Sequence, residues 1–371
     1  MKQPHQYEAR ILLAVTGLSP QIVTETLYAL TQVQQPAFVP TRVVVITTAD
    51  GASRVRLELL SEDKAWFRRL CEEYDLPEIR FDEEDIHIIR DDAGHPLADI
   101  RSPEQNSHVA DQISEIVRNL AADEHSAIHA SIAGGRKTMG FYLGYALSLY
   151  GRPQDRLSHV LVDEGFEGNR EFFYPSRRPR TIHDREQNPM DASQARVMLA
   201  DIPFVRLRDG LPERLLAGTS RFSETIEAAQ RFYQEPELIV RPGQRQLVCN
   251  GSEINLTPVP FALYLAMVKR MQEEMDFAGW DDEGLKAGFL SSLAQVVSTN
   301  SGKYENAEKA MREHFIEQYF APHVSRIKKE MEEQLGSRGA RPFLIQARGP
   351  RGARRYGLAL EPYQVQIEAD A

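Results

Sequence analysis

Five consecutive residues that can bind phosphate, Gly134-Gly135-Arg136-Lys137-Thr138, separate an apolar run typical of a buried strand from an apolar helix-like run. Glycines allow a positive φ and let a ligand approach the backbone closely. The first N–H groups of a helix have no intrahelical acceptor and bind anions, while Arg136 and Lys137 add positive charge and Thr138 adds a hydroxyl. We therefore predict a phosphate-binding turn. The alternative is an ordinary strand-to-helix connection with solvated cations.

A second polar loop, Thr16-Gly17-Leu18-Ser19-Pro20-Gln21, follows the first predicted strand. Ser19 precedes a proline suited to the first position of a helix, so it is well placed to cap that helix. In an open parallel sheet this loop also borders the crevice where ligands bind, so Ser19 could face the Gly134 loop. We assign Thr16, Gly17, Ser19 and Gln21 to the ligand site, and capping stays open as the alternative role of Ser19.

Other polar residues are expected at the same edge of the sheet. Thr47 and Thr48 follow the second strand, and Asp99 and Arg101 precede a helix. Their alternative roles are helix capping and ion pairing. The strand end before the glycines completes the predicted ligand-binding set with Ser131, Ala133, Gly134, Gly135 and Thr138.

Two common nucleotide-binding motifs do not fit. A phosphate-binding loop of the ATPase type needs Gly four residues before Gly-Lys-Thr, but Ser131 and Arg136 stand at the outer and inner glycine positions. The Gly-x-Gly-x-x-Gly fingerprint of dinucleotide enzymes is absent as well. We expect no cofactor.

The elements that must position these loops alternate between apolar strands and amphipathic helices, as in a parallel sheet covered by helices. The predicted strands are Arg10 to Thr16, Arg42 to Thr48, Asp85 to Ile89, Ala127 to Ile132 and Ser158 to Val162, with Glu171 to Tyr174 as an edge candidate. The predicted helices are Pro20 to Val33, Ser53 to Tyr74, Pro103 to Ala121 and Lys137 to Tyr150. This half of the chain is predicted to be α/β and Rossmann-like.

The remainder has a different pattern. Residues 175–195 are polar, without periodicity, and are expected to form a long loop. After a predicted connecting helix at 223–234, two short strands (238–241, 246–249) precede four helices (258–275, 282–299, 306–319, 322–335) and a hairpin from 342–347 and 354–360. We predict a domain at 1–208, a connecting segment at 209–235 and a winged helix-turn-helix domain at 236–371.

Composition favours a soluble, folded protein. The 371 residues are 42% hydrophobic and 26% charged, with a net charge of -10, so any anion site must be a local concentration of positive charge. Cys71 and Cys249 fit neither a disulfide framework nor a zinc site, and we expect no metal. Without a signal-peptide pattern or a run of about 20 apolar residues, we expect a cytoplasmic protein that does not interact with membranes.

Positive charge gathers near the C-terminus, where residues 326–356 hold nine Lys or Arg against three Glu. In winged helices a basic helix enters the major groove and basic wing residues contact phosphates. The candidate residues for binding double-stranded DNA are Arg326, Lys328, Lys329, Arg348, Arg351, Arg354 and Arg355. The alternative is a solvated helix face and a hairpin that serves dimerisation.

Four ordered motifs, TGLSPQIVTETLYAL, DIRSPEQN, SIAGGRKTMGFYLGYALSLYG and RLSHVLV, resemble the CRISPR-associated Rossmann-fold (CARF) proteins, in particular the ring-nuclease-like family. The resemblance covers residue 10 to about residue 175. It implies a homodimer that binds a cyclic oligoadenylate, most simply cyclic tetra-adenylate, and that cleaves it slowly without metal. Ser19 and Lys137 match the serine and lysine that ring nucleases use.

Cleavage of this kind has a ribose 2′-hydroxyl attack the adjacent phosphate, which leaves a 2′,3′-cyclic phosphate. We expect Lys137 and Arg136 to stabilise the charge and Ser19 to orient the hydroxyl or hold a phosphate oxygen. Related sensors carry a ribonuclease domain marked by Arg and His on a helix, but the only match, Arg178 and His183, lies in a proline-containing segment. The rival hypothesis is a transcription regulator that binds the ring without cutting it.

Overall fold

The computed structural model describes residues 2–218, 220–312, 316–350 and 352–368. The chain forms two compact units, Met1–Arg208 and Asp209–Ala371. The first is an α/β unit built on a mainly parallel sheet, as predicted. Among the described residues, no helix is long and apolar enough to span a bilayer.

The sheet of the first unit has the order β3-β2-β1-β4-β5-β8. Its bounds are β1 Ala9–Val15, β2 Arg42–Thr47, β3 Ile86–Ile88, β4 Ser126–Ser131, β5 Arg156–Val162 and β8 Val197–Asp201. Strand β1 pairs in parallel with β2 (Leu13 with Val44) and with β4 (Leu13 with Ala130). Both central strands are buried on their two faces, which explains their near-continuous apolar sequence.

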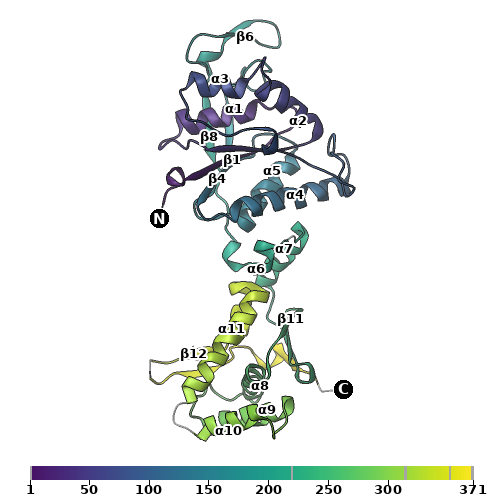
Figure 1. The fold of residues 1–371 in the computed structure, drawn as a ribbon, viewed down its shortest axis with the longest axis vertical. Coiled ribbons are helices and arrows are strands. Elements are labelled where there is room, and N and C mark those ends of the chain that lie inside the picture. The colour runs from purple at the N-terminus through teal and green to yellow at the C-terminus, as the bar shows by residue number, and fades with distance from the viewer. Residues whose placement is uncertain (1, 219, 313–315, 351, 369–371) are drawn as a thin grey trace. The chain divides into compact units, whose positions relative to one another are not determined.

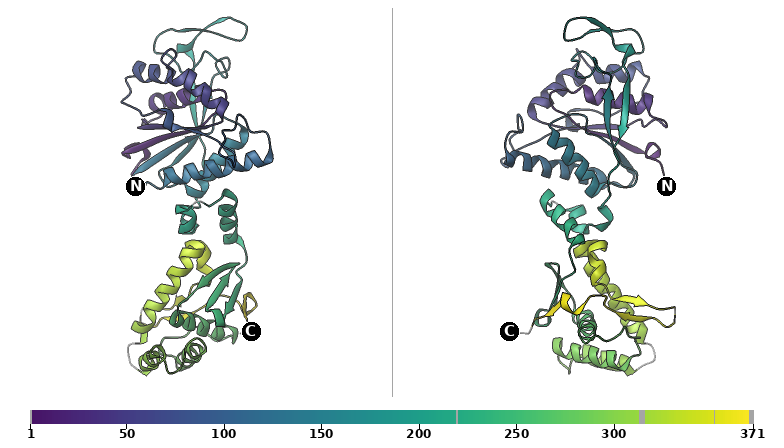
Figure 2. Two further views of the ribbon diagram at one scale, coloured as in Figure 1. Left: turned by 45° about the vertical axis from the view of Figure 1, so that its right-hand side comes forward. Right: turned by 180° about the vertical axis from the view of Figure 1, so that it is seen from behind.

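Helices cover both faces of this sheet. Figure 1 shows α1 (Gln21–Tyr28), α2 (Ala49–Val55) and α3 (Trp66–Glu73) on one face, and α4 (Pro103–Ala121) and α5 (Lys137–Tyr150) on the other. The views in Figure 2 show the same two layers. The bounds of α4 and α5 agree with the sequence prediction. In α4 this follows from a capping box, in which Ser102 and Gln105 satisfy each other's backbone N–H groups.

One predicted helix agrees in extent and another does not. Helix α1 continues after Tyr28 as a wider π-helical turn to Val33, so this helical stretch ends where it was predicted to end. The segment predicted as one helix from Ser53 to Tyr74 starts at Ala49 and is interrupted after Leu60, because Ser61 is extended, and α3 begins only after Ala65, which has a left-handed φ of 46°. The amphipathic pattern continues across this break, so periodicity alone did not reveal it.

The predicted edge strand from Glu171 to Tyr174 is wrong. These residues form turns, and the consecutive side chains of Phe172, Phe173 and Tyr174 are buried in the hydrophobic clusters of the unit. The edge of the sheet is instead β8, which pairs antiparallel with β5. The predicted loop at 175–195 contains a short hairpin of β6 (Thr181–His183) and β7 (Pro189–Asp191).

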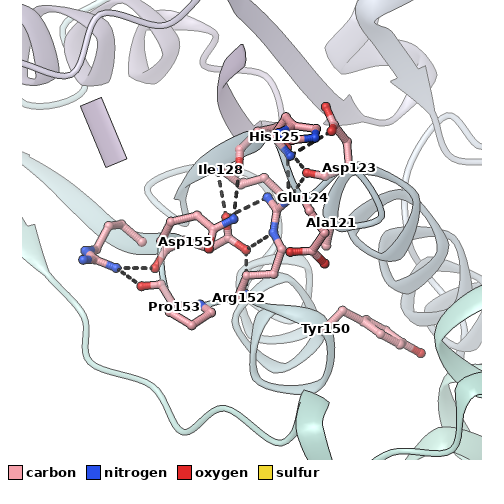
Figure 3. Close-up of polar contacts among 12 residues, drawn as sticks. Ala121, Asp123, Glu124, His125, Ile128, Tyr150, Arg152, Pro153 and Asp155 are labelled. Atoms are coloured by element: carbon pink, nitrogen blue, oxygen red, sulfur yellow. Dashed lines mark hydrogen bonds and ion pairs between the residues drawn. The ribbon is translucent and has the colours of Figure 1, made fainter. Parts of the chain in front are cut away.

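A buried ion pair joins the ends of α5 and β5 that lie away from the phosphate-binding turn (Figure 3). Arg152 and Asp155 have side-chain exposures of 1% and 0% and approach to 2.9 Å. Asp155 also accepts the backbone N–H of Ile128 on β4, at 2.9 Å. Arg208, the last residue of the unit, donates to the carbonyls of Ala121 and Tyr150, at the ends of α4 and α5.

The second unit combines a small sheet with helices. The sheet order is β11-β10-β9-β14, with β9 Leu238–Arg241, β10 Gln246–Cys249, β11 Ser252–Asn255 and β14 Val365–Ile367. The helices are α6 Glu213–Ala217, α7 Phe222–Gln230, α8 Pro258–Gln272, α9 Glu283–Val296, α10 Gly302–Arg312 and α11 Ile316–Ala340. Strands β12 (Gln346–Arg348) and β13 (Arg355–Gly357) form the predicted terminal hairpin.

Helix α11 differs from its prediction. Its described part begins at Ile316 and passes through Pro322, where a separate helix was predicted to start. Pro322 lies in the second turn of this part, so its missing N–H removes one intrahelical hydrogen bond. Strand β14, which pairs in parallel with β9, was not predicted because Val365–Ile367 is short and polar at its centre.

Candidate ligand-binding site

The loops after β1 and β4 meet at the carboxyl edge of the first sheet. These strands are neighbours, and the chain continues from β1 to β2 on one side and from β4 to β5 on the other. Such a reversal opens the crevice in which α/β sheets bind ligands. A Cβ atom placed on Gly17 would lie 3.5 Å from Cα of Gly135, so the two loops are in van der Waals contact.

Gly134 and Gly135 are required by this close approach. A Cβ atom on Gly134 would lie 2.8 Å from the carbonyl oxygen of Val15 and 2.9 Å from a side-chain carbon of Ile22. Gly135 has a φ of 76°, which a residue with a Cβ atom adopts only at a cost. The glycines therefore allow the turn to form directly against the first strand.

The turn leads into the start of α5 with Arg136, Lys137 and Thr138 exposed. No side chain caps this helix, and Met139 is its first residue whose N–H reaches a backbone carbonyl, that of Arg136, at 2.9 Å. Lys137 forms no ion pair with any described residue. The start of α5 thus combines uncapped amides with an unpaired cation, an arrangement that binds anions.

Arg136 is held by the loop that precedes α4. Its Nε donates to Oδ1 of Asp99 at 2.9 Å, and its Nη2 donates to Oδ2 of the same carboxylate. Nε of Arg101 approaches Asp99 at 3.4 Å. Hydrogen bonding to Arg136 lowers the pKa of Asp99 to about 2, so this carboxylate is ionised at neutral pH. The structure brings these three predicted residues together.

Several predicted hydroxyls lie beneath the surface instead. Thr16, Thr47 and Ser131 are fully buried. The Thr16 hydroxyl donates to the carbonyl of Ser19 at 3.0 Å, and that of Thr47 donates to the carbonyl of Thr16 at 2.7 Å. Ser131 Oγ lies 3.2 Å from Oγ1 of Thr26 on α1. These contacts fix the shape of the loops, and ligand contact by the three hydroxyls stays a prediction.

Of the other predicted site residues, two have structural contacts and one is exposed. Thr48 caps α2 by accepting from the N–H of Gly51, and Ala133 packs on a hydrophobic cluster. Ser19 is exposed and does not cap α1, whose N-cap is Pro20, so the suggested capping role is wrong. Its hydroxyl has no hydrogen-bond partner among the described residues.

A buried carboxyl group near this site was missed. Glu25, on α1, is 7% exposed, and burial followed by repulsion from Glu167 raises its pKa to about 8. One turn earlier, Gln21 donates to the carbonyl of Arg170 at 3.4 Å, while its Oε1 is buried without a partner. The sequence did contain one signal for this residue: Glu25 lies within the run of α1 positions that are buried.

Replacing Glu25 with glutamine is expected to stabilise the first unit most at alkaline pH. The folded protein keeps the Glu25 proton up to about pH 8, whereas an unfolded chain loses it near 4.5. The free energy of unfolding contributed by this group therefore falls as pH rises between those values, by about 3 to 5 kcal/mol. Urea unfolding at pH 5 and pH 8.5 measures this. A gain in the free energy of unfolding for Glu25→Gln that is equal at both pH values contradicts the prediction. Glu167→Gln, which removes the repelling charge, should give a smaller gain of the same sign.

The predicted DNA-binding cations have mixed surroundings. On α11, Arg326, Lys328 and Lys329 lie 3.9, 3.8 and 3.5 Å from the glutamates four residues later, which reduces their net positive charge. Arg348 lies over the Phe277 ring, with 4.0 Å from Cζ to the ring centroid. Arg354 and Arg355 are exposed, and Arg351 lies outside the described residues.

Comparison with solved structures gives two matches of low structural similarity. The chain matches a structure described as a type III CRISPR defence DNA nuclease activated by cyclic oligoadenylate, with 18% identity and a TM-score of 0.26. It also matches Enterococcus italicus Csm6 bound to cyclic hexa-2′-fluoro-hexa-dAMP, with 12% identity and a TM-score of 0.26. The matches cover 87% and 86% of this chain but only 36% and 56% of those chains. Such scores are too low to establish a shared fold.

Sequence comparison gives the family. None of the curated proteins matches the chain. The family model for CRISPR-associated protein NE0113 matches residues 19–235, which is more than half of the chain and includes both loops of the candidate site except Thr16, Gly17 and Leu18. The chain therefore belongs to the CRISPR-associated protein NE0113 family.

Proposed function

We propose that the first unit binds a cyclic oligoadenylate, with cyclic tetra-adenylate as the first ring to test, and cleaves it as a metal-independent ring nuclease. The main support is the exposed Lys137 at the uncapped start of α5, next to a loop that presents the hydroxyl of Ser19, neither of which has a polar partner in the part of the chain that the structure describes. Membership of a CRISPR-associated family and the resemblance of four motifs to CARF proteins support the choice of ligand.

The proposed reaction needs alignment and charge stabilisation. The ribose 2′-oxygen attacks the adjacent phosphorus and loses its proton to water, and the bond from phosphorus to the 5′-oxygen breaks as that oxygen takes a proton from water. The products carry a 2′,3′-cyclic phosphate and a 5′-hydroxyl. Lys137 stabilises the negative charge on the phosphate oxygens, with the amides of the α5 start, and Ser19 orients the 2′-hydroxyl. With no carboxylate or imidazole in these two loops to act as a base, the reaction is expected to be slow.

A homodimer completes the proposal. Phe141, four residues after Lys137 and on the same face of α5, is 61% exposed and contacts the rings of Tyr142 and Tyr145 at 5.7 and 5.8 Å between centroids. Large exposed aromatic groups mark protein interfaces. A second copy covering this face would bring two phosphate-binding turns near one ring. Sedimentation analysis of Phe141→Ser tests whether this face supports association.

The direct test is incubation of purified protein, in excess over ring and in the presence of EDTA, with cyclic tetra-adenylate. Products are separated and identified by mass. Linear fragments that end in a 2′,3′-cyclic phosphate support the proposal. A ring that stays intact while binding is detected excludes the nuclease and leaves the sensor. Absence of binding excludes both.

The second candidate is a ring-gated transcription regulator. The observation that favours it is the exposed pair Arg354 and Arg355, next to the hairpin that follows the helices of the second unit, as in a winged helix. The ion pairs on α11 weaken the case for its basic residues. Salt-dependent retention of promoter DNA that changes with added ring would support the regulator, and no retention at low salt would exclude it.

A further inference from the structure

The carboxylate of Asp99 occupies the side of the Arg136 guanidinium at which an anionic ligand would bind. Two guanidinium donors of Arg136, Nε and Nη2, are directed at the two oxygens of this one carboxylate. Arginine binds phosphate through the same paired geometry. Asp99 also accepts the N–H of Ile100 at 2.8 Å, which fixes its orientation toward Arg136.

We propose that Asp99 acts as a built-in competitor that a ligand phosphate must displace from Arg136. The inference rests on the proposed function only for the identity of the ring. The competitor is an ion pair in which the Arg136 side chain is 57% exposed, so water screens it and it is weak enough to exchange. Arg136 is the N-cap residue of α5, so it adjoins Lys137 and the uncapped start of that helix in the sequence.

Exchange at Arg136 would change the restraints on α4. Asp99 lies three residues before Ser102, the N-cap of α4. Further along, Asn106 of α4 donates to the Tyr142 hydroxyl of α5 at 2.5 Å. Once a phosphate replaces the carboxylate, this hydrogen bond still connects the two helices, and the N–H of Arg101 still donates to Oε1 of Gln105 at 2.8 Å, but Asp99 no longer holds the loop to Arg136. Asp99 therefore sets the affinity of the site and links its occupancy to the mobility of that loop.

A double-mutant cycle tests this role. Asp99→Asn keeps the oxygen that accepts from Ile100 and removes the charge. We expect Asp99→Asn to bind cyclic tetra-adenylate about three to five times more tightly than wild type. Arg136→Ala should bind about tenfold more weakly, and the double variant should equal Arg136→Ala, since Asp99 then has nothing to compete for. Fluorescence anisotropy of a labelled ring measures all four affinities.

Asp92→Asn is the matched control, because it makes the same charge change at an exposed position of the same connecting segment. The proposal is overturned if Asp99→Asn binds the ring no more tightly than wild type and Asp92→Asn do. If Asp99→Asn binds more weakly than both, Asp99 is a residue that positions Arg136. Hydrogen exchange of residues 98–106 provides a second readout. It should rise on ligand binding in wild type and should already be raised in free Asp99→Asn.

A second probe separates this inference from the proposed function. The same cycle is measured with pyrophosphate, which has no adenine. If pyrophosphate binds and the ring does not, the proposed ring-binding function is wrong. The role of Asp99 as a competitor is then tested by the affinities of the four proteins for pyrophosphate. If neither probe binds, no phosphate displaces Asp99 and the inference fails as well.

Discussion

Replacing Lys137 with alanine is expected to slow ring cleavage by about a hundredfold or more while the protein stays folded. One well-placed donor to a charge that develops in the transition state contributes about a factor of 10² to 10³. Lys137 is exposed and makes no ion pair with a described residue, so its removal should leave the packing of α5 unchanged. Single-turnover cleavage with excess protein measures the effect without interference from product release.

Two control variants define this result. Lys64→Ala removes a lysine of the first unit that pairs with Glu58, and its cleavage rate should equal that of wild type. Lys137→Arg keeps the charge but changes the donor geometry, so it should bind the ring while cleaving it more slowly. If Lys137→Ala cleaves as fast as Lys64→Ala, Lys137 takes no part in the reaction.

Replacing Asp155 with alanine is expected to lower the free energy of unfolding of the first unit by about 3 to 5 kcal/mol. The change leaves the guanidinium of Arg152 charged and 1% exposed. It also removes the acceptor for the backbone N–H groups of Ile128 and Arg152. Urea unfolding gives the value. The chain has two tryptophans, Trp66 and Trp280, one in each unit, so a Trp280→Phe background reports on the first unit alone.

Asp75→Asn is the comparison for this variant. Asp75 pairs with Arg177 on the surface, with side-chain exposures of 80% and 49%, so loss of its charge should cost less than about 1 kcal/mol. Asparagine is chosen because it tolerates the left-handed φ of 52° at this position. A double variant, Arg152→Leu with Asp155→Leu, should be more stable than Asp155→Ala because no buried charge stays unpaired. An equal effect of Asp155→Ala and Asp75→Asn would contradict the prediction.

Local signals decided how well the fold could be predicted. Helix α4 begins at a capping box and α5 follows a Gly-Gly turn, so both had clear starts in the sequence. The break between Leu60 and Trp66 had no such signal, since it is formed by an extended Ser61 and a left-handed Ala65, two residues that often occur inside helices. The edge strand was misassigned because three aromatic residues suggested β structure, whereas packing in two hydrophobic clusters determines their position.

The candidate site was predictable where the backbone alone forms it. The glycines, Arg136, Lys137 and Thr138 form one turn, so their proximity followed from the sequence. Periodicity cannot tell an exposed hydroxyl from a buried one in a loop after a strand, and so Thr16 was predicted to bind the ligand alongside Ser19, although only Ser19 is exposed. Glu25 escaped notice because its burial is decided by tertiary packing, and the charge that repels it, Glu167, lies more than 140 residues away in the sequence.

The contact of Arg208 with the ends of α4 and α5 has an electrostatic consequence. The aligned peptide dipoles of a helix amount to about half a positive charge at its start and half a negative charge at its end. Arg208 supplies a cation to the final carbonyls of both helices, at Ala121 and Tyr150. The first turn of α5 has no acidic residue. The negative pole of α5 is therefore compensated by Arg208, while the carboxylate of Asp99, held on Arg136, is the charge that opposes its positive pole until a ligand phosphate takes that place.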